Sequence, residues 1–154
     1  MSKEKYVVKS RDELWDIIED ADIDADLNYL DVSNITDMSY LFRNSDFNGN
    51  ISNWDTSNVE NMCGMFSLSK FNGDISNWNV SNVTDMESMF YFSDFTRDIS
   101  NWDVSNVEYM AQMFCYSKFN GDISNWNVSN VKDMRWMFNR SPLKYNPPKW
   151  FNKK

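Results

Sequence analysis

Side chains that could perform catalysis are scarce in this chain of 154 residues. It contains no histidine, which excludes a Ser-His-Asp triad, an HExxH zinc site and any acid–base step through imidazole. The two cysteines, Cys63 and Cys115, lie far apart and form no CxxC pair, so a disulfide framework is not indicated. No position combines a unique nucleophile, a base and an oxyanion donor. We therefore expect a protein that is not an enzyme and uses no cofactor.

The strongest charge feature is a run of carboxylates near the N-terminus. The chain has 15 Lys and Arg against 23 Asp and Glu, for a net charge of −8. Residues 12–26 hold eight acids and no base, so the acids and bases elsewhere balance at 15 each. These acids, which we name the acidic cap, are Asp12, Glu13, Asp16, Glu19, Asp20, Asp22, Asp24 and Asp26. Two interpretations stay open: a solvated helix face, or a docking patch for a partner protein with a basic surface.

Two acidic patterns raise the question of a bound cation. Asp20-x-Asp22-x-Asp24 resembles the start of a calcium loop, but Ala25 occupies the position that needs glycine for the sharp turn. A second set recurs every 24 residues and would form a column of like charges. Its members are Asp74, Asp98 and Asp122. Capping of the backbone that leads into each predicted strand explains this column more simply than a cation does, and we expect no metal site.

A period of 24 residues organises most of the chain. The unit reads F-N-G-D-I-S-N-W-x-V-S-N-V-x-x-M-x-x-M-F-x-x-S-x. Three of its recurring series are Trp54, Trp78, Trp102, Trp126 and Trp150; Met38, Met62, Met86, Met110 and Met134; and Phe42, Phe66, Phe90, Phe114 and Phe138. A fixed period of this length predicts a solenoid, in which each unit buries its apolar side against its neighbours. Five steps of 24 separate Leu30 from Trp150, so we expect about five rungs.

Apolar spacing within a unit predicts one short strand and one short helical turn. Trp78 and Val80 are two residues apart, the period of a strand, so both side chains should point inward. Val83, Met86 and Met89 follow at helical spacing, but the segment is too short for more than about one turn. Charges agree with a parallel stack, because one position reads Asp, Lys, Asp, Lys in successive units. Those residues are Asp46, Lys70, Asp94 and Lys118.

A longer motif within the unit allows comparison with a known family. Its parts are Phe71-Asn72-Gly73-Asp74-Ile75-Ser76-Asn77-Trp78, then Val80-Ser81-Asn82-Val83, then Asp85-Met86 and Met89-Phe90. This unit resembles the bacterial surface-protein repeat family with BspA-like leucine-rich repeats, a domain of unknown function. The resemblance spans roughly Asp26 to Trp150 and implies a leucine-rich-repeat-like fold with a role in protein interaction. Many members of that family look like exported surface proteins, whereas no signal sequence is seen here.

The two ends carry different signals. Residues 6–8 favour a short strand, and Ser10 with Glu13 forms a capping box that predicts a helix over the first rung. Pro147 and Pro148 should blunt the other end, because proline donates no hydrogen bond to a further strand. We therefore expect one structural domain, an α/β solenoid with a strand and helix cap over residues 1–29, the repeats over 30–150 and a tail over 151–154. The repeats should form a leucine-rich-repeat-like stack of about five 24-residue rungs, with short parallel strands and short helical turns.

Two further surfaces are candidates for partner binding. One is the outward face of the predicted strands, named here the Asx side. Its residues are Asp31, Asn53, Asp55, Asn77, Asn79, Asn101, Asp103, Asn125 and Asn127. The other is the variable segment after each recurring Phe or Met, where apolar side chains share positions in successive units. Its candidates are Leu68, Tyr91, Phe92, Tyr116 and Trp136.

These features favour a non-catalytic protein–protein interaction module that presents a rigid repeat surface. One alternative is an acidic intracellular inhibitor that occupies the basic nucleic-acid-binding site of a partner protein. A second alternative is a bacterial surface adhesin, which the family resemblance favours. The acidic balance argues against direct nucleic-acid binding, and no apolar run is long enough to cross a membrane. Without a visible signal peptide we expect a cytoplasmic protein; the resemblance points instead to the cell surface.

Overall fold

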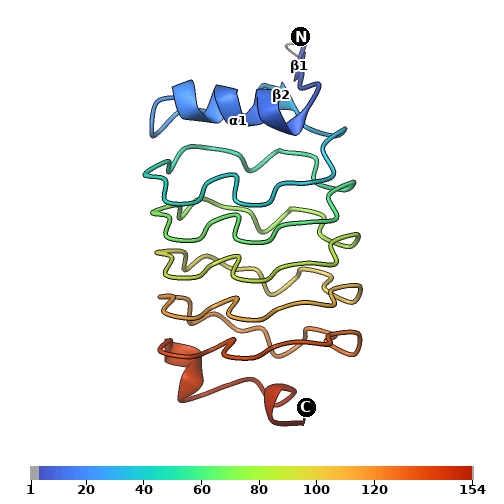
Figure 1. The fold of residues 1–154 in the computed structure, drawn as a ribbon, viewed down its shortest axis with the longest axis vertical. Coiled ribbons are helices and arrows are strands. Elements are labelled where there is room, and N and C mark those ends of the chain that lie inside the picture. The colour runs from blue at the N-terminus through green and yellow to red at the C-terminus, as the bar shows by residue number, and fades with distance from the viewer. Residues whose placement is uncertain (1–3, 154) are drawn as a thin grey trace.

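Successive 24-residue units lie on one another in the computed structural model, which describes residues 4–153 (Figure 1). Single parallel bridges connect equivalent residues of neighbouring units. They join Asp26 to Asn50, Asp37 to Asn61, Asn61 to Asp85, Asp85 to Tyr109 and Tyr109 to Asp133. Every partner is 24 residues away, so the sequence period sets the register of the stack. Residues 1–3 and 154, parts of the expected cap and tail, lie outside the described residues.

Regular secondary structure occurs only toward the two ends of residues 4–153. The two-residue strand β1 (Tyr6–Val7) pairs in parallel with β2 (Leu30–Asp31). Helix α1 (Arg11–Asp20) lies across the N-terminal end of the stack (Figure 1). Two 3₁₀ helices, η1 (Pro142–Lys144) and η2 (Phe151–Lys153), follow the last unit. None of these helices has the length and apolar composition needed to span a bilayer.

The predicted helix near the N-terminus is confirmed. Ser10 is its N-cap, and its hydroxyl accepts the N–H of Glu13 at 3.1 Å. Leu14 and Ile18, one turn apart, are buried against the first layer. Arg11 adds a polar anchor, because its guanidinium donates to the carbonyl of Ser39.

The predicted leucine-rich-repeat-like α/β solenoid of about five rungs is wrong. Between β2 and η1 the described chain contains no helix and no strand, only single bridges and a succession of turns. The units are therefore layers of turns joined edge to edge.

Left-handed residues prevent the predicted helical turn. Ser88 and Phe92 have φ of 54° and 52°, values that interrupt a right-handed helix. The N–H groups of Met86, Ser88 and Phe90 donate to carbonyls of the next layer, at 2.9 Å each. The N–H of Met89 donates to the carbonyl of Met86 at 3.2 Å, and this four-residue turn produces a spacing of three that resembles a helix.

The predicted strand fails for a related reason. Trp78 and Val80 do point inward, since both are nearly fully buried. However, Trp78 closes a turn by donating its N–H to the carbonyl of Ile75 at 3.2 Å, and Val83 does the same to Val80 at 3.0 Å. Backbone groups used within turns are not available for a strand ladder.

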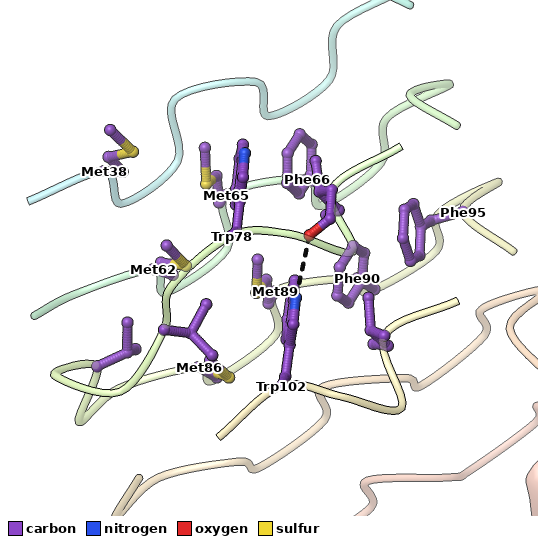
Figure 2. Packing of buried hydrophobic residues seen from close by; sticks show 14 of the residues in the cluster. Met38, Met62, Met65, Phe66, Trp78, Met86, Met89, Phe90, Phe95 and Trp102 are labelled. Carbon is purple, nitrogen blue, oxygen red and sulfur yellow. Dashed lines mark hydrogen bonds between the residues drawn. The ribbon is translucent and has the colours of Figure 1, made fainter. Parts of the chain in front are cut away.

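Aromatic and methionine side chains fill the interior between the layers (Figure 2). Phe90 stacks between Phe66 and Phe114, with ring centroids 5.7 Å apart on each side. The indole N–H of Trp102 donates to the carbonyl of Ile75 in the previous layer at 3.1 Å, the dashed line in Figure 2. The same bond to the residue 27 positions earlier is made by Trp54, Trp78, Trp126 and Trp150. Each indole thus satisfies its only donor while its ring fills the core.

Candidate protein-interaction surface

The Asx side carries a hydrogen-bonded network rather than a strand face. Alternate members of the predicted set accept the N–H of the serine two residues later, the geometry of an Asx turn. These members are Asp31, Asp55, Asn79, Asp103 and Asn127, with distances of 3.0 to 3.1 Å. The other members, Asn53, Asn77, Asn101 and Asn125, are exposed. Five of the nine predicted residues are therefore already engaged in local structure.

The column of Asp74, Asp98 and Asp122 is explained in the same way. Each carboxylate accepts a serine N–H at 2.9 Å. Hydrogen bonds from the hydroxyl and the backbone N–H of Ser76 hold the pKa of Asp74 below its ordinary value. The predicted capping role is confirmed, although these carboxylates cap turns and not strands.

Asparagine side chains on the Asx side also tie the layers together. The amide of Asn82 donates to the carbonyl of Ser57 at 2.6 Å, and that of Asn106 donates to Ser81 at 2.7 Å. Asn58 and Asn130 repeat the contact at the ends of the series. These four asparagines bond between layers, whereas Asn53, Asn77, Asn101 and Asn125 stay exposed.

A different part of the stack, which we name the turn face, carries the variable segment. It consists of residues 40–44, 64–68, 88–92, 112–116 and 136–140. Two positions of each segment have positive φ. One column is Tyr40, Gly64, Ser88, Gln112 and Trp136, and the other is Asn44, Leu68, Phe92, Tyr116 and Arg140. Left-handed conformation is uncommon outside glycine, so its recurrence shows that the stack imposes it.

The backbone of the turn face is bonded both within and between layers. The N–H groups of Gly64, Phe66 and Leu68 donate to the next layer at 2.7 to 2.9 Å. The intervening N–H groups of Met65 and Ser67 close turns within their own layer, at 3.2 and 3.0 Å. Alternate N–H groups thus bond to the next layer and within their own layer, which fixes the backbone. Side chains that project from a fixed backbone need little ordering on binding.

Apolar side chains project outward from the turn face. Leu68, Phe92 and Tyr116 occupy one column and are 40%, 55% and 39% exposed. The rings of Phe92 and Tyr116 lie 5.4 Å apart, and Tyr91 meets the edge of Tyr116 at 6.0 Å. Arg140 places its guanidinium 5.5 Å from the Tyr116 ring. The predicted apolar column therefore exists and is open to solvent, as a contact surface would be.

Shallow recesses extend this surface toward helix α1. One, of about 250 Å³, is lined by Tyr40, Arg43, Leu68 and Tyr91 among others. A second, of about 510 Å³, brings Asp12, Asp16 and Trp15 beside Tyr40 and Arg43. The structure thus joins part of the acidic cap to the turn face, two surfaces that the sequence separates.

Three residues of this surface were not among the predicted binding residues. Arg43 lies 5.5 Å from the Tyr40 ring, a cation–π contact at the edge of both recesses. Trp15 contributes from α1. Tyr40 and Arg43 fall within the variable segment, because they occupy the positions of the candidates Trp136 and Tyr91 in other units. No repeat signal reaches Trp15, which precedes the first unit.

The acidic cap is mostly exposed and mostly free of partners within residues 4–153. Glu13 is an exception, since it accepts the hydroxyl of Tyr6 at 2.5 Å and the N–H of Lys9 at 2.6 Å. The bond from Tyr6 holds the pKa of Glu13 below its ordinary value. Asp26 accepts the N–H of Asn28 at 3.0 Å. In the described part of the chain, no ion pair or side-chain hydrogen bond engages Asp12, Asp16, Glu19, Asp20, Asp22 or Asp24.

Within the described part of the chain, neither metal binding nor thiol chemistry has a visible site. Within residues 4–153, no three Cys, Asp or Glu side chains gather closely enough to hold a metal ion, including those of the calcium-like run. Burial raises the pKa of both Cys63 and Cys115, which keeps the thiols protonated near neutral pH. Both cysteines are free.

Comparison with known proteins places the chain in a family. A family model described as "Mycoplasma protein of unknown function, DUF285" matches residues 13–115 and again residues 92–152. The chain belongs to this family. The two DUF285 matches share residues 92–115, a span of one 24-residue unit, as expected where a repeat can be aligned in more than one register. Membership of a bacterial family of unknown function is confirmed, while the BspA-like leucine-rich-repeat character is not. No curated protein and no solved structure matches the DUF285 chain significantly.

Proposed function

We propose that this DUF285 chain is a non-catalytic protein-binding module that recognises its partner with the turn face. The observation that carries the proposal is the solvent-exposed column of Leu68, Phe92 and Tyr116 on a hydrogen-bonded backbone. Exposed aromatic residues flanked by arginine are the side chains that dominate protein interfaces. The fixed backbone lowers the entropic cost of binding, so a modest apolar area can suffice.

The partner proposed for this surface is a protein with an apolar patch beside basic residues. The apolar patch would meet the Leu68–Phe92–Tyr116 column. The basic residues would meet Asp12 and Asp16, which lie beside Tyr40 and Arg43 at the N-terminal edge of the turn face. Apolar contacts would supply affinity, and the carboxylates would raise the rate of encounter.

Site-specific photo-crosslinking tests this proposal, because it captures a bound protein of any identity. A photoreactive phenylalanine analogue replaces Phe92, and in a matched control it replaces Tyr29, which is 50% exposed near the Asx side. After irradiation in extracts of the source cells, a discrete crosslinked protein should appear at position 92 and not at position 29. The triple variant Leu68→Ser, Phe92→Ser, Tyr116→Ser should then lose binding of the purified partner while its melting temperature is retained. Crosslinks at position 29 alone, or unchanged binding by the folded triple variant, would refute the turn face as the site.

A second candidate is the acidic intracellular inhibitor. The observation that favours it is the set of six exposed carboxylates on α1 and the following loop that no described residue neutralises. Such a surface could occupy a basic nucleic-acid-binding site of another protein. The amide variant Asp12→Asn, Asp16→Asn, Glu19→Gln, Asp20→Asn should then abolish binding, and wild-type binding should weaken steeply between about 0.05 and 0.5 M salt. If binding survives both the amide substitutions and high salt, the inhibitor proposal fails and the apolar column remains the proposed site.

The relation to BspA-like surface repeats is also proposed and supports an adhesin as the remaining alternative. It rests on the motif Phe71–Trp78 with Val80–Val83, and the family match itself carries no functional description. Surface labelling of intact source cells with a membrane-impermeant reagent distinguishes this alternative. Labelling of the chain favours an adhesin, and labelling only after lysis favours the intracellular proposals.

A further inference from the structure

The last unit of the stack ends in an open row of backbone donors. In the unit before it, four N–H groups donate to the next layer at 2.8 to 3.0 Å. They belong to Met110, Gln112, Phe114 and Tyr116, and their acceptors are the carbonyls of Asp133, Arg135, Met137 and Asn139. The equivalent N–H groups of the last unit are those of Met134, Trp136, Phe138 and Arg140. None of these four finds an acceptor among residues 4–153.

The first unit presents the complementary row of acceptors. The carbonyl of Ser39 is taken by the Arg11 guanidinium. The carbonyls at equivalent alternate positions, those of Asp37, Leu41 and Arg43, accept no hydrogen bond in the described part of the chain. Helix α1 lies across this row and Arg11 occupies one of its carbonyls, so a second copy would meet the exposed side of α1 and not the row itself.

Side-chain charge follows the same division. Residues 130–154 contain seven Lys and Arg and one acid, whereas residues 12–26 contain eight acids and no base. Lys132 and Arg135 are already paired, with Glu108 at 2.6 Å and Asp133 at 2.7 Å. Arg140, Lys144 and Lys149 are exposed, and no ion pair among residues 4–153 neutralises them. The stack is thus basic at its C-terminal end and acidic at its N-terminal end.

Apolar groups accompany the charges at both ends. Trp136 is 65% exposed and lines a recess of about 530 Å³ with Lys132, Arg135 and Phe151. At the N-terminal end, a recess of about 310 Å³ opens between α1 and residues 41–47, next to the one that Asp12 and Asp16 border. A large exposed indole beside cations, and a recess beside carboxylates, are the complementary parts of an interface.

From these observations we infer that the C-terminal end of one copy docks on the acidic cap of a second copy, so that chains associate head to tail. Trp136 is the apolar anchor, and Arg140, Lys144 and Lys149 face Asp16, Glu19 and Asp20 of the next chain. Because the two contacting surfaces differ, the contact does not close on itself and continues into longer chains of copies. Trp136 and Arg140 belong to the last segment of the turn face, and Arg140 lies 5.5 Å from the Tyr116 ring. The contact therefore borders the column at Tyr116 and leaves Leu68 and Phe92 available for another partner.

Sedimentation of two neutralised variants tests this contact. The cap variant is Asp16→Asn, Glu19→Gln, Asp20→Asn, and the tail variant is Arg140→Gln, Lys144→Gln, Lys149→Gln. Wild-type protein should show a mass that rises with concentration at about 0.05 M salt and falls as salt screens the charges. Each variant alone should associate at least about tenfold more weakly. An equimolar mixture should form a dimer that does not grow, because one tail and one cap remain intact.

Two control variants separate specific docking from general charge attraction. Trp136→Ser leaves every charge in place and should weaken association about tenfold, the loss typical of an interface anchor. Phe92→Ser, which changes an exposed ring on the turn face, should leave association unchanged. A wild-type chain that stays monomeric at millimolar concentration in low salt overturns the inference. The inference is also overturned if both neutralised variants still associate as wild type does. It is overturned as well if the equimolar mixture of the two variants behaves as the sum of its components.

Discussion

The Asx side and the turn face arise from the same 24-residue unit and differ in what their side chains do. On the Asx side, asparagine and aspartate recur in successive layers and bond to the local backbone or to the layer before. On the turn face, backbone hydrogen bonds and the buried Phe series join the layers, and the outward side chains vary. This difference shows that the residue type at a position can vary where backbone atoms join the layers. The residue type recurs where a side chain joins them. Variation within the repeat therefore marks the surface that stacking leaves free.

Phe90 and Phe92 give the largest expected contrast, although they are only two residues apart. Phe90 is fully buried between two other rings, whereas Phe92 is 55% exposed. Phe90→Ala should lower the free energy of unfolding by about 3–5 kcal/mol, through lost burial and the cavity left behind. Phe92→Ala should change it by less than about 0.5 kcal/mol. Urea unfolding followed by circular dichroism measures both, and similar losses would show that the turn face also belongs to the core.

Trp102→Phe tests the contribution of a side chain that bonds between layers. The substitution keeps an aromatic ring in the core and removes the donor that reaches the carbonyl of Ile75 at 3.1 Å. An unsatisfied buried carbonyl should lower the free energy of unfolding by about 1–3 kcal/mol. Trp136→Phe is the matched control, because that indole is exposed and should be nearly neutral. Equal effects at the two positions would mean that the indole N–H contributes little to the stacking.

Several features of the fold follow from the sequence by elementary rules. The 24-residue register, the inward direction of Trp78 and Val80, and the helix after Ser10 are all confirmed. Two predicted ion pairs also form, Lys70 with Asp46 at 2.8 Å and Lys118 with Asp94 at 2.6 Å. Periodicity reports which side chains share an environment, and in a stack that environment repeats once per layer.

The backbone conformation of each layer does not follow from the same rules. Spacings of two and three residues arise in strands and helices but also in successive turns, so Trp78 and Met86 fit both descriptions. Positive φ at Ser88, Gln112 and Phe92 distinguishes successive turns from a strand or a helix. These residue types rarely adopt positive φ. Only contacts between layers force that conformation, and they are invisible in a local window of sequence. That Asp12 and Arg43 line one recess is likewise set by how α1 crosses the stack.

Ser88 and Gly64 occupy one turn-face position and allow the backbone strain to be measured. Ser88 has φ of 54°, and Ser88→Gly should raise the free energy of unfolding by about 1 kcal/mol, because glycine adopts this conformation readily. Gly64 has φ of 60°, and the Tyr40 ring lies where a Cβ would project. Gly64→Ala should therefore destabilise by about 1–2 kcal/mol. Thermal unfolding of both variants provides the check. A stabilised Gly64→Ala protein would show that the left-handed positions carry no strain.

Acid pH should produce the smallest effect, and carboxylates of the Asx side should contribute to it. Bonds from the hydroxyl and N–H of the following serine hold the pKa of Asp55 and Asp103 below the ordinary value of 3.8. A carboxylate with a lowered pKa in the folded state contributes stability above its unfolded pKa, and that stability is lost as pH falls through the folded value. The melting temperature should therefore decline below about pH 4. Asn79 and Asn127 occupy the same turn position with the same bond to serine at 3.0 and 3.1 Å. Asp55→Asn, Asp103→Asn should thus keep the turns and show a shallower decline than wild type, whereas an identical decline would assign the acid sensitivity to other carboxylates.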